Sequence, residues 1–97
     1  MAKTLLGKAF ATKTRRVEFA LEMPEAKVVN VAGTFNNWEP SQYPLRKGSD
    51  GVWRTIVFVS GGRHEYRFIV DGEWMSDPKA PESVANPHGS NNSVLEA

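Results

Sequence analysis

The feature that most constrains the fold of this chain is the alternation of apolar and polar residues that begins at Arg15. Val17, Phe19 and Leu21 alternate with polar or small residues as far as Glu22. A period of two residues is typical of a strand with one buried face. No segment longer than about ten residues shows helical periodicity. The chain is therefore expected to build its core from sheets.

Further segments of alternating or β-branched residues predict more strands: Lys27 to Ala32, Gln42 to Leu45, Val52 to Val59, His64 to Val70, Glu73 to Met75 and Asn92 to Glu96. Asp50-Gly51 and Asp71-Gly72 are dipeptides that favour tight hairpin turns. Ser60-Gly61-Gly62 is expected to fold the strand after Val52 back onto a partner that begins at His64. Three prolines between Asp77 and Gly89 predict an irregular crossing there.

These roughly six or seven short strands, separated by frequent turns, predict an all-β antiparallel β-sandwich. A chain of 97 residues supports one domain. The absence of cysteine excludes disulfide frameworks, thiolate zinc sites and a cysteine nucleophile. A net charge of +1 gives no reason to expect a nucleic-acid partner. No run approaches the roughly 20 apolar residues of a membrane span, so a cytoplasmic protein is expected.

The charges are unevenly distributed along the chain. Five basic residues precede the first acid, Glu18: Lys3, Lys8, Lys13, Arg15 and Arg16. The remainder holds seven basic and eleven acidic residues. We predict a flexible basic arm over residues 1–14 and the sandwich over residues 15–97. The alternative for the arm is a weak electrostatic tether to an anionic surface or partner.

The residues that could carry catalysis have structural explanations. His64 and His88 do not stand in a metal-ligand spacing. Asp71 is explained as the first residue of a hairpin turn, and Asp77 by its place before Pro78. No glycine-rich phosphate loop precedes a helix. The sequence therefore predicts a protein that is not an enzyme and that needs no cofactor or metal.

The three tryptophans fall into two classes. Trp53 lies on the strongest predicted strand and is expected in the core. Trp38 lies in a polar loop and Trp74 follows a turn, so both are expected at the surface. Exposed indoles suit the C–H face of a pyranose ring, while the amides of Asn36, Asn37, Asn91 and Asn92 and the guanidinium of Arg67 suit its hydroxyls. Stacking on nucleic-acid bases is the alternative, and the acidic body disfavours it.

Six motifs occur in an order that resembles the family 48 carbohydrate-binding modules. That family includes the glycogen-binding domains of AMP-activated protein kinase β subunits and the N-terminal domains of isoamylases and branching enzymes. The resemblance runs from about Arg15 to Glu96. It rests on Val31–Trp38 (VAGTFNNW), Gly51–Trp53 (GVW), His64–Phe68 (HEYRF), Val70–Trp74 (VDGEW), Asp77-Pro78 and Asn91-Asn92.

The resemblance implies an immunoglobulin-like, early-set sandwich that binds α-1,4-linked glucan without catalysis. It implies that Trp38 and Trp74 cradle the glucan, and that Arg67 stands at the family's sugar-contacting lysine. Three further positions follow from it: the contact residue Asn91, Ser90 as a source of a hydroxyl, and Pro87 where kinase members carry a leucine that reaches over the sugar. A supporting role is expected for Asn36 or Asn37.

Two other functions stay open at this point. The sandwich could be a protein-interaction module in which exposed strand edges, with Ile56 or Phe58, meet a partner or a second copy in a weak homo-oligomer. It could also be an accessory domain that acts with a separate amylase-like, glucan-active enzyme.

Overall fold

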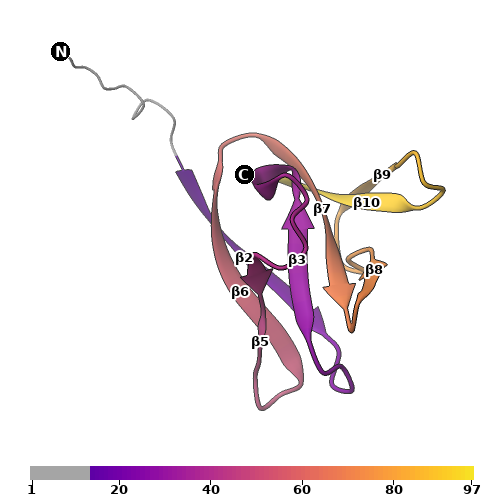
Figure 1. The fold of residues 1–97 in the computed structure, drawn as a ribbon. Helices are drawn as coiled ribbons and strands as arrows, with labels where there is room; N and C mark the ends of the chain where they lie inside the picture. Colours follow the sequence, from indigo (N-terminus) through magenta and orange to yellow (C-terminus); the bar gives the residue numbers. More distant parts are fainter. Residues whose placement is uncertain (1–13) are drawn as a thin grey trace.

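Two antiparallel sheets pack against each other in the computed structural model, which describes residues 14–97 (Figure 1). The smaller sheet has three strands, which pair in the order β2 (Thr14–Glu22), β6 (Val52–Ser60) and β5 (Arg46–Lys47). All but the last residue of the predicted basic arm lie outside the described residues. The all-β antiparallel sandwich expected from the sequence is confirmed.

The larger sheet has six strands: β3 (Val29–Gly33), β4 (Tyr43–Pro44), β7 (Arg63–Val70), β8 (Glu73–Met75), β9 (Glu82–Ala85) and β10 (Asn91–Glu96). Its order is β4-β3-β7-β10-β9, with β8 attached to β7. A 3-10 turn, η3 (Thr34–Asn36), follows β3. Along one edge of β7, Arg63–Tyr66 pair with β10 and Phe68–Val70 pair with β8. Arg67 lies where one pairing gives way to the other.

The core lies between the inner faces of the two sheets. Phe19 and Val57 contribute to it from the smaller sheet, and Val31 and Phe68 from the larger one. Trp53 is 7% exposed, and its indole N–H donates a hydrogen bond to the Met23 carbonyl at 2.9 Å. Its predicted place in the core is confirmed, and its polar edge is satisfied as a buried indole requires.

The hairpin between β7 and β8 forms as predicted. Asp71 and Gly72 both adopt positive φ, 50° and 87°, as a two-residue hairpin turn requires. The Asp71 carboxylate also accepts hydrogen bonds from the backbone N–H groups of Lys27 and Val28, at 2.8 and 2.9 Å. These two bonds hold the pKa of Asp71 below its ordinary value. The turn residue therefore also fastens the chain that enters β3.

Two expectations about the strands are wrong. The chain after Ser60-Gly61-Gly62 does not pair with β6: β6 pairs with β2 and β5, whereas β7 pairs with β3, β10 and β8 in the other sheet. The glycine turn carries the chain from one layer to the other. The segment from Asp77 to Gly89 is also not irregular throughout, because β9 lies within it and pairs with β10.

Strand alternation decides which side chains lie on the outer face of the larger sheet. On β7, Tyr66 and Phe68 are buried toward the core, so Glu65 and Arg67 lie on the opposite, outer face. On β10, buried Ser93 pairs with Tyr66, so Asn92 belongs to the outer face. Among residues 14–97 there is no helix of the length and apolarity that a membrane span needs.

Candidate functional site

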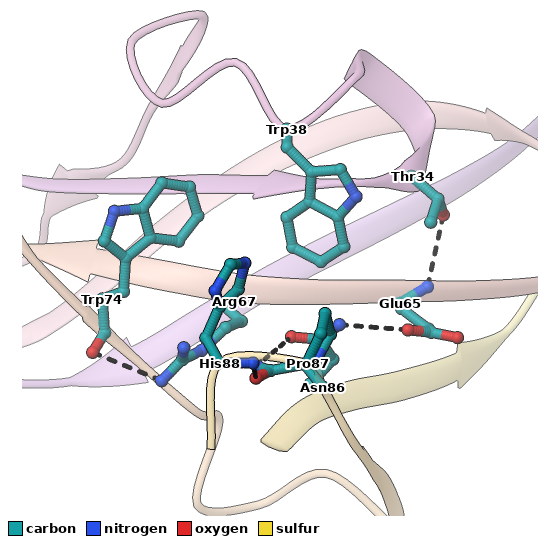
Figure 2. A pocket seen from close by; sticks show the side chains of 9 residues that line it. Thr34, Trp38, Glu65, Arg67, Trp74, Asn86, Pro87 and His88 are labelled. Atoms are coloured by element: carbon teal, nitrogen blue, oxygen red, sulfur yellow. Dashed lines mark hydrogen bonds between the residues drawn. The ribbon is translucent and has the colours of Figure 1, made fainter. Parts of the chain in front are cut away.

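A groove of about 560 Å³ lies on the outer face of the larger sheet (Figure 2). Four parts of the chain form it: the loop at η3, the strand pair β7–β8, the β9–β10 loop and the start of β10. Its lining residues are Thr34, Trp38, Glu65, Arg67, Trp74, Asn86, Pro87, His88 and Asn92. Segments far apart in the sequence therefore meet over one sheet face.

Two tryptophans form the apolar part of the groove. The ring centroids of Trp38 and Trp74 are 6.4 Å apart, and their planes are inclined by 48°. Trp74 is 41% exposed and Trp38 is half-buried. Figure 2 shows the two indoles side by side along one wall of the groove. The pair offers an angled surface rather than one flat plane.

The loop that carries Trp38 is held in an unusual conformation. Asn37 and Trp38 both have positive φ, 57° and 59°. For a residue such as Trp this costs roughly 1–2 kcal/mol. The Trp38 N–H donates to the Gly33 carbonyl at 2.9 Å. The Asn36 amide also accepts from Gly33 N–H and donates to the Glu39 carbonyl, each at 3.0 Å.

Arg67 joins the two halves of the groove. Its Nη1 donates to the Ser90 hydroxyl at 2.8 Å, and its Nη2 donates to the Trp74 carbonyl at 3.4 Å. The guanidinium therefore links β8 to the β9–β10 loop at the point where β7 changes partner. Its Nε atom is buried without a hydrogen-bond partner among residues 14–97.

Asn86 holds the β9–β10 loop with its whole side chain. Its Oδ1 accepts from the backbone N–H groups of His88 at 2.9 Å and Ser90 at 3.2 Å. Its Nδ2 donates to the Ser90 hydroxyl at 3.0 Å and to Asn92 Oδ1 at 3.1 Å. An amide side chain has two donors and two acceptor positions. All four are occupied, so the loop is ordered before any ligand binds.

The groove floor is tied to the core through a histidine. Thr34 Oγ1 lies 3.1 Å from His64 Nδ1 and accepts from the Glu65 N–H at 3.2 Å. His64 Nε2 lies 2.8 Å from the Ser60 carbonyl. A carbonyl only accepts, so Nε2 carries the proton and Nδ1 accepts from the Thr34 hydroxyl. His64 is thus a buried structural residue with both nitrogens satisfied.

The carboxylates considered for catalysis have structural partners. Asp77 accepts from the Tyr66 hydroxyl at 2.5 Å and from the Lys79 N–H at 2.9 Å. Burial, and secondly this hydrogen bond, raise the pKa of Tyr66. Asp71 fastens its turn, as described above. No cluster of three or more His, Cys, Asp or Glu that could hold a metal ion is found among residues 14–97.

The groove brings together three of the residues predicted from the sequence: Trp38, Trp74 and Arg67. Ser90 is not a lining residue, and its hydroxyl accepts from Arg67 and Asn86. Asn37 and Asn91 are exposed and are outside the lining.

Sequence reasoning assigned no binding role to Thr34, Glu65, Asn86 and His88, all of which line the groove. Strand alternation alone could have found Glu65, because it lies on the same face as Arg67. Asn92, named only among several amides, lines the groove in place of its neighbour Asn91.

Residues 17–97 match the family described as "Glycogen recognition site of AMP-activated protein kinase". The chain belongs to this family. The resemblance seen in the motifs is confirmed at this level, and the match covers every residue that lines the groove.

Individual relatives of two kinds are similar to the chain. A 1,4-alpha-glucan branching enzyme of Xanthomonas campestris is 38% identical over 76 residues, which is 73% of this chain and 10% of the enzyme. The beta-1 subunit of 5′-AMP-activated protein kinase from Sus scrofa is 37% identical over 70 residues, covering 72% of this chain and 54% of that sequence. The human beta-1 subunit has the same identity, and the match covers 24% of it. The chain thus spans between a tenth and about half of these relatives.

Proposed function

We propose that the chain is a non-catalytic binding module for α-1,4-linked glucans such as glycogen or starch. The observation that carries the proposal is the tilted pair of Trp38 and Trp74 in an open groove, in a chain of the glycogen-recognition family. Its relatives include a protein named for a reaction on 1,4-alpha-glucan.

The proposed mechanism is stacking combined with hydroxyl recognition. Each indole covers the C–H face of a glucose unit, and the 48° between the rings suits two successive units of a curved chain. Arg67 supports both walls of the groove and has further guanidinium hydrogens for a ligand. Because the ligand is neutral, binding releases water rather than counterions and should depend little on salt.

Tryptophan fluorescence tests the proposal directly, because two of the three indoles line the groove. Titration with maltoheptaose should change the emission. Trp38→Ala and Trp74→Ala should each weaken binding by about tenfold or more, because each removes a large apolar contact. Phe58→Ala is the matched control, since it removes an exposed aromatic side chain on the other sheet. Unchanged retention of both tryptophan variants on amylose, with the fold intact, would falsify the proposal.

A second function is favoured by one observation. Phe58 is 63% exposed on the outer face of the smaller sheet, and Ile56 lies on the same face two residues before it. An exposed aromatic of this kind suits a protein contact. We propose this face as the side toward a glucan-active enzyme or a second copy of the chain. Sedimentation that depends on concentration in the wild type but not in Phe58→Ser would support it.

A further inference from the structure

A glucan in the groove needs polar partners as well as indole faces. Stacking covers the C–H face of a sugar, while the hydroxyls at its rim lose water and must form new hydrogen bonds. A polar side chain of the groove can bind a sugar hydroxyl only with a donor or acceptor that is not already bonded within the protein. The hydrogen bonds within the protein therefore show which side chains are available.

Most polar side chains of the groove are committed to the protein itself. The Thr34 hydroxyl binds both His64 and the Glu65 N–H. The amide of Asn86 has all four positions occupied. The Nη atoms of Arg67 are directed at the Trp74 carbonyl and Ser90. Thr34 and Asn86 therefore have little capacity left for a ligand, whereas two of the four Nη hydrogens of Arg67 form no hydrogen bond within residues 14–97.

Besides Arg67 and the indole N–H groups, two further side chains in the groove have polar atoms that form no hydrogen bond within residues 14–97. Among residues 14–97, His88 forms a hydrogen bond through its backbone N–H only, so both nitrogens of its ring are unoccupied. Glu65 accepts from Asn92 Nδ2 through Oε1 at 3.0 Å, which leaves Oε2 without a partner in the same part of the chain. Both residues line the groove with the tryptophans.

We propose that His88 and Glu65 form a hydroxyl-recognition pair in the groove, in addition to Arg67. A neutral imidazole has one donor and one acceptor, which matches a sugar hydroxyl, and the carboxylate oxygen is a strong acceptor. Figure 2 shows the His88 ring rising from the β9–β10 loop toward the gap between the two indoles. This inference rests on the proposed glucan binding and names the residues that complete it.

The backbone at His88 is held by hydrogen bonds within the protein. Its N–H is held by Asn86 Oδ1, and the loop closes with a bond from the Asn86 N–H to the Ser90 carbonyl at 2.8 Å. Glu65 is similarly held by Asn92 on the neighbouring strand. A side chain on an ordered backbone loses less freedom on binding than one on a mobile loop. The pair is therefore suited to recognition and not only to solvation.

Calorimetric titration with maltoheptaose tests the pair through His88→Ala and Glu65→Ala. Each variant should weaken binding by about threefold to tenfold, the effect of losing one ligand hydrogen bond. His88→Gln should recover much of the loss, because its amide again supplies a donor and an acceptor. Glu18→Ala, which removes an exposed carboxylate on β2 of the other sheet, should bind as the wild type does. Urea denaturation of each variant checks that the fold is retained.

A second measurement uses the two histidines of the chain as probe and reference. In proton–carbon spectra, maltoheptaose should shift the ring signals of His88 more than those of His64, which is 8% exposed. If Trp38→Ala abolishes binding while either His88→Ala or Glu65→Ala binds like the wild type, the pair is wrong and glucan binding stands. If the wild type itself does not respond to maltoheptaose, both proposals fail together.

Discussion

The outer faces of the two sheets both carry exposed aromatic residues. On the larger sheet these residues line the groove, whereas Phe58 on the smaller sheet is not a lining residue. On the smaller sheet, Phe58 stands opposite Arg16 and is 63% exposed. On the larger sheet, Trp74 is 41% exposed and lies beside Trp38, which a loop brings over the sheet. An exposed ring alone offers apolar area. On the larger sheet, loops that are held by the side chains of Asn36 and Asn86 form a groove around the exposed rings.

The largest expected effect comes from the backbone that the groove face needs. A Cβ on Gly33 would overlap the Glu65 carbonyl and lie 2.6 Å from Phe35 Cε2. Gly33→Ala should therefore lower the free energy of unfolding by about 3 kcal/mol. Gly61→Ala is the control, because the nearest neighbours of its Cβ would be Arg15 side-chain atoms at 3.7–3.8 Å, an ordinary contact distance. Equal stability of the two variants in urea would show that η3 can shift without cost.

The next largest effect should come from the β9–β10 loop. Asn86→Ala removes four hydrogen bonds and should lower stability by roughly 1–2 kcal/mol, because the site is partly exposed. Glucan binding should fall by about tenfold, since His88 and Arg67 lose their support. The matched variant Asn91→Ala should change binding by less than about twofold, because that side chain is outside the groove lining. A larger loss there would favour the sugar contact that the family resemblance implies.

The other face should respond weakly. Phe58→Ser removes an exposed ring and should leave the free energy of unfolding within about 0.5 kcal/mol of the wild type. Retention on amylose should also be unchanged, because Phe58 and the groove lie on different sheets. Thermal unfolding and affinity electrophoresis measure the two quantities. Weaker glucan binding in this variant would mean that the two faces are coupled, and the comparison between them would fail.

The sequence predicted the fold correctly where a short segment determines its own structure. The Asp71-Gly72 turn specifies a two-residue hairpin, and the bounds expected for β8 agree with the structure. The turn at Gly61-Gly62 specifies only a change of direction. Whether the chain returns to the same sheet depends on contacts between layers, which no local pattern contains. The prolines around β9 obscured a strand that needs β10 as its partner.

The site was partly predictable for the same reason. Trp38 was predicted at the surface because it lies in a polar loop, Trp74 because it follows a turn, and Arg67 because alternation directs it outward; all three line the groove. The choice between Asn91 and Asn92 depends on the register of β10, in which Ser93 faces the core opposite Tyr66. The free atoms of His88 and Glu65 become apparent only after every neighbouring hydrogen bond is assigned. Those hydrogen bonds join segments that are far apart in the sequence, so no local pattern predicts them.

The smallest expected effect is a difference in acid stability between variants of two turn carboxylates, one in each sheet. Asp71 accepts from the N–H groups of Lys27 and Val28, more than forty positions away in the chain, whereas Asp50 bonds within its own hairpin to Arg54 and Val52. Hydrogen bonds from Val28 and then Lys27 lower the pKa of Asp71, and the one from Arg54 is the main cause of the lowered pKa of Asp50.

A carboxyl whose pKa is lower in the folded state stabilises the protein above its unfolded pKa of about 3.9, and this stabilisation is lost as the pH falls through the folded value. Asp71→Asn keeps an acceptor and tolerates the positive φ, but it does not titrate. The loss of thermal stability between about pH 5 and pH 2 should therefore be shallower than in the wild type. Asp50→Asn should flatten it less, because its contacts are local. If Asp50→Asn flattens the pH dependence more than Asp71→Asn does, then Asp50 in the smaller sheet, and not the bonds from Asp71 to the chain before β3, causes most of the loss of stability at low pH.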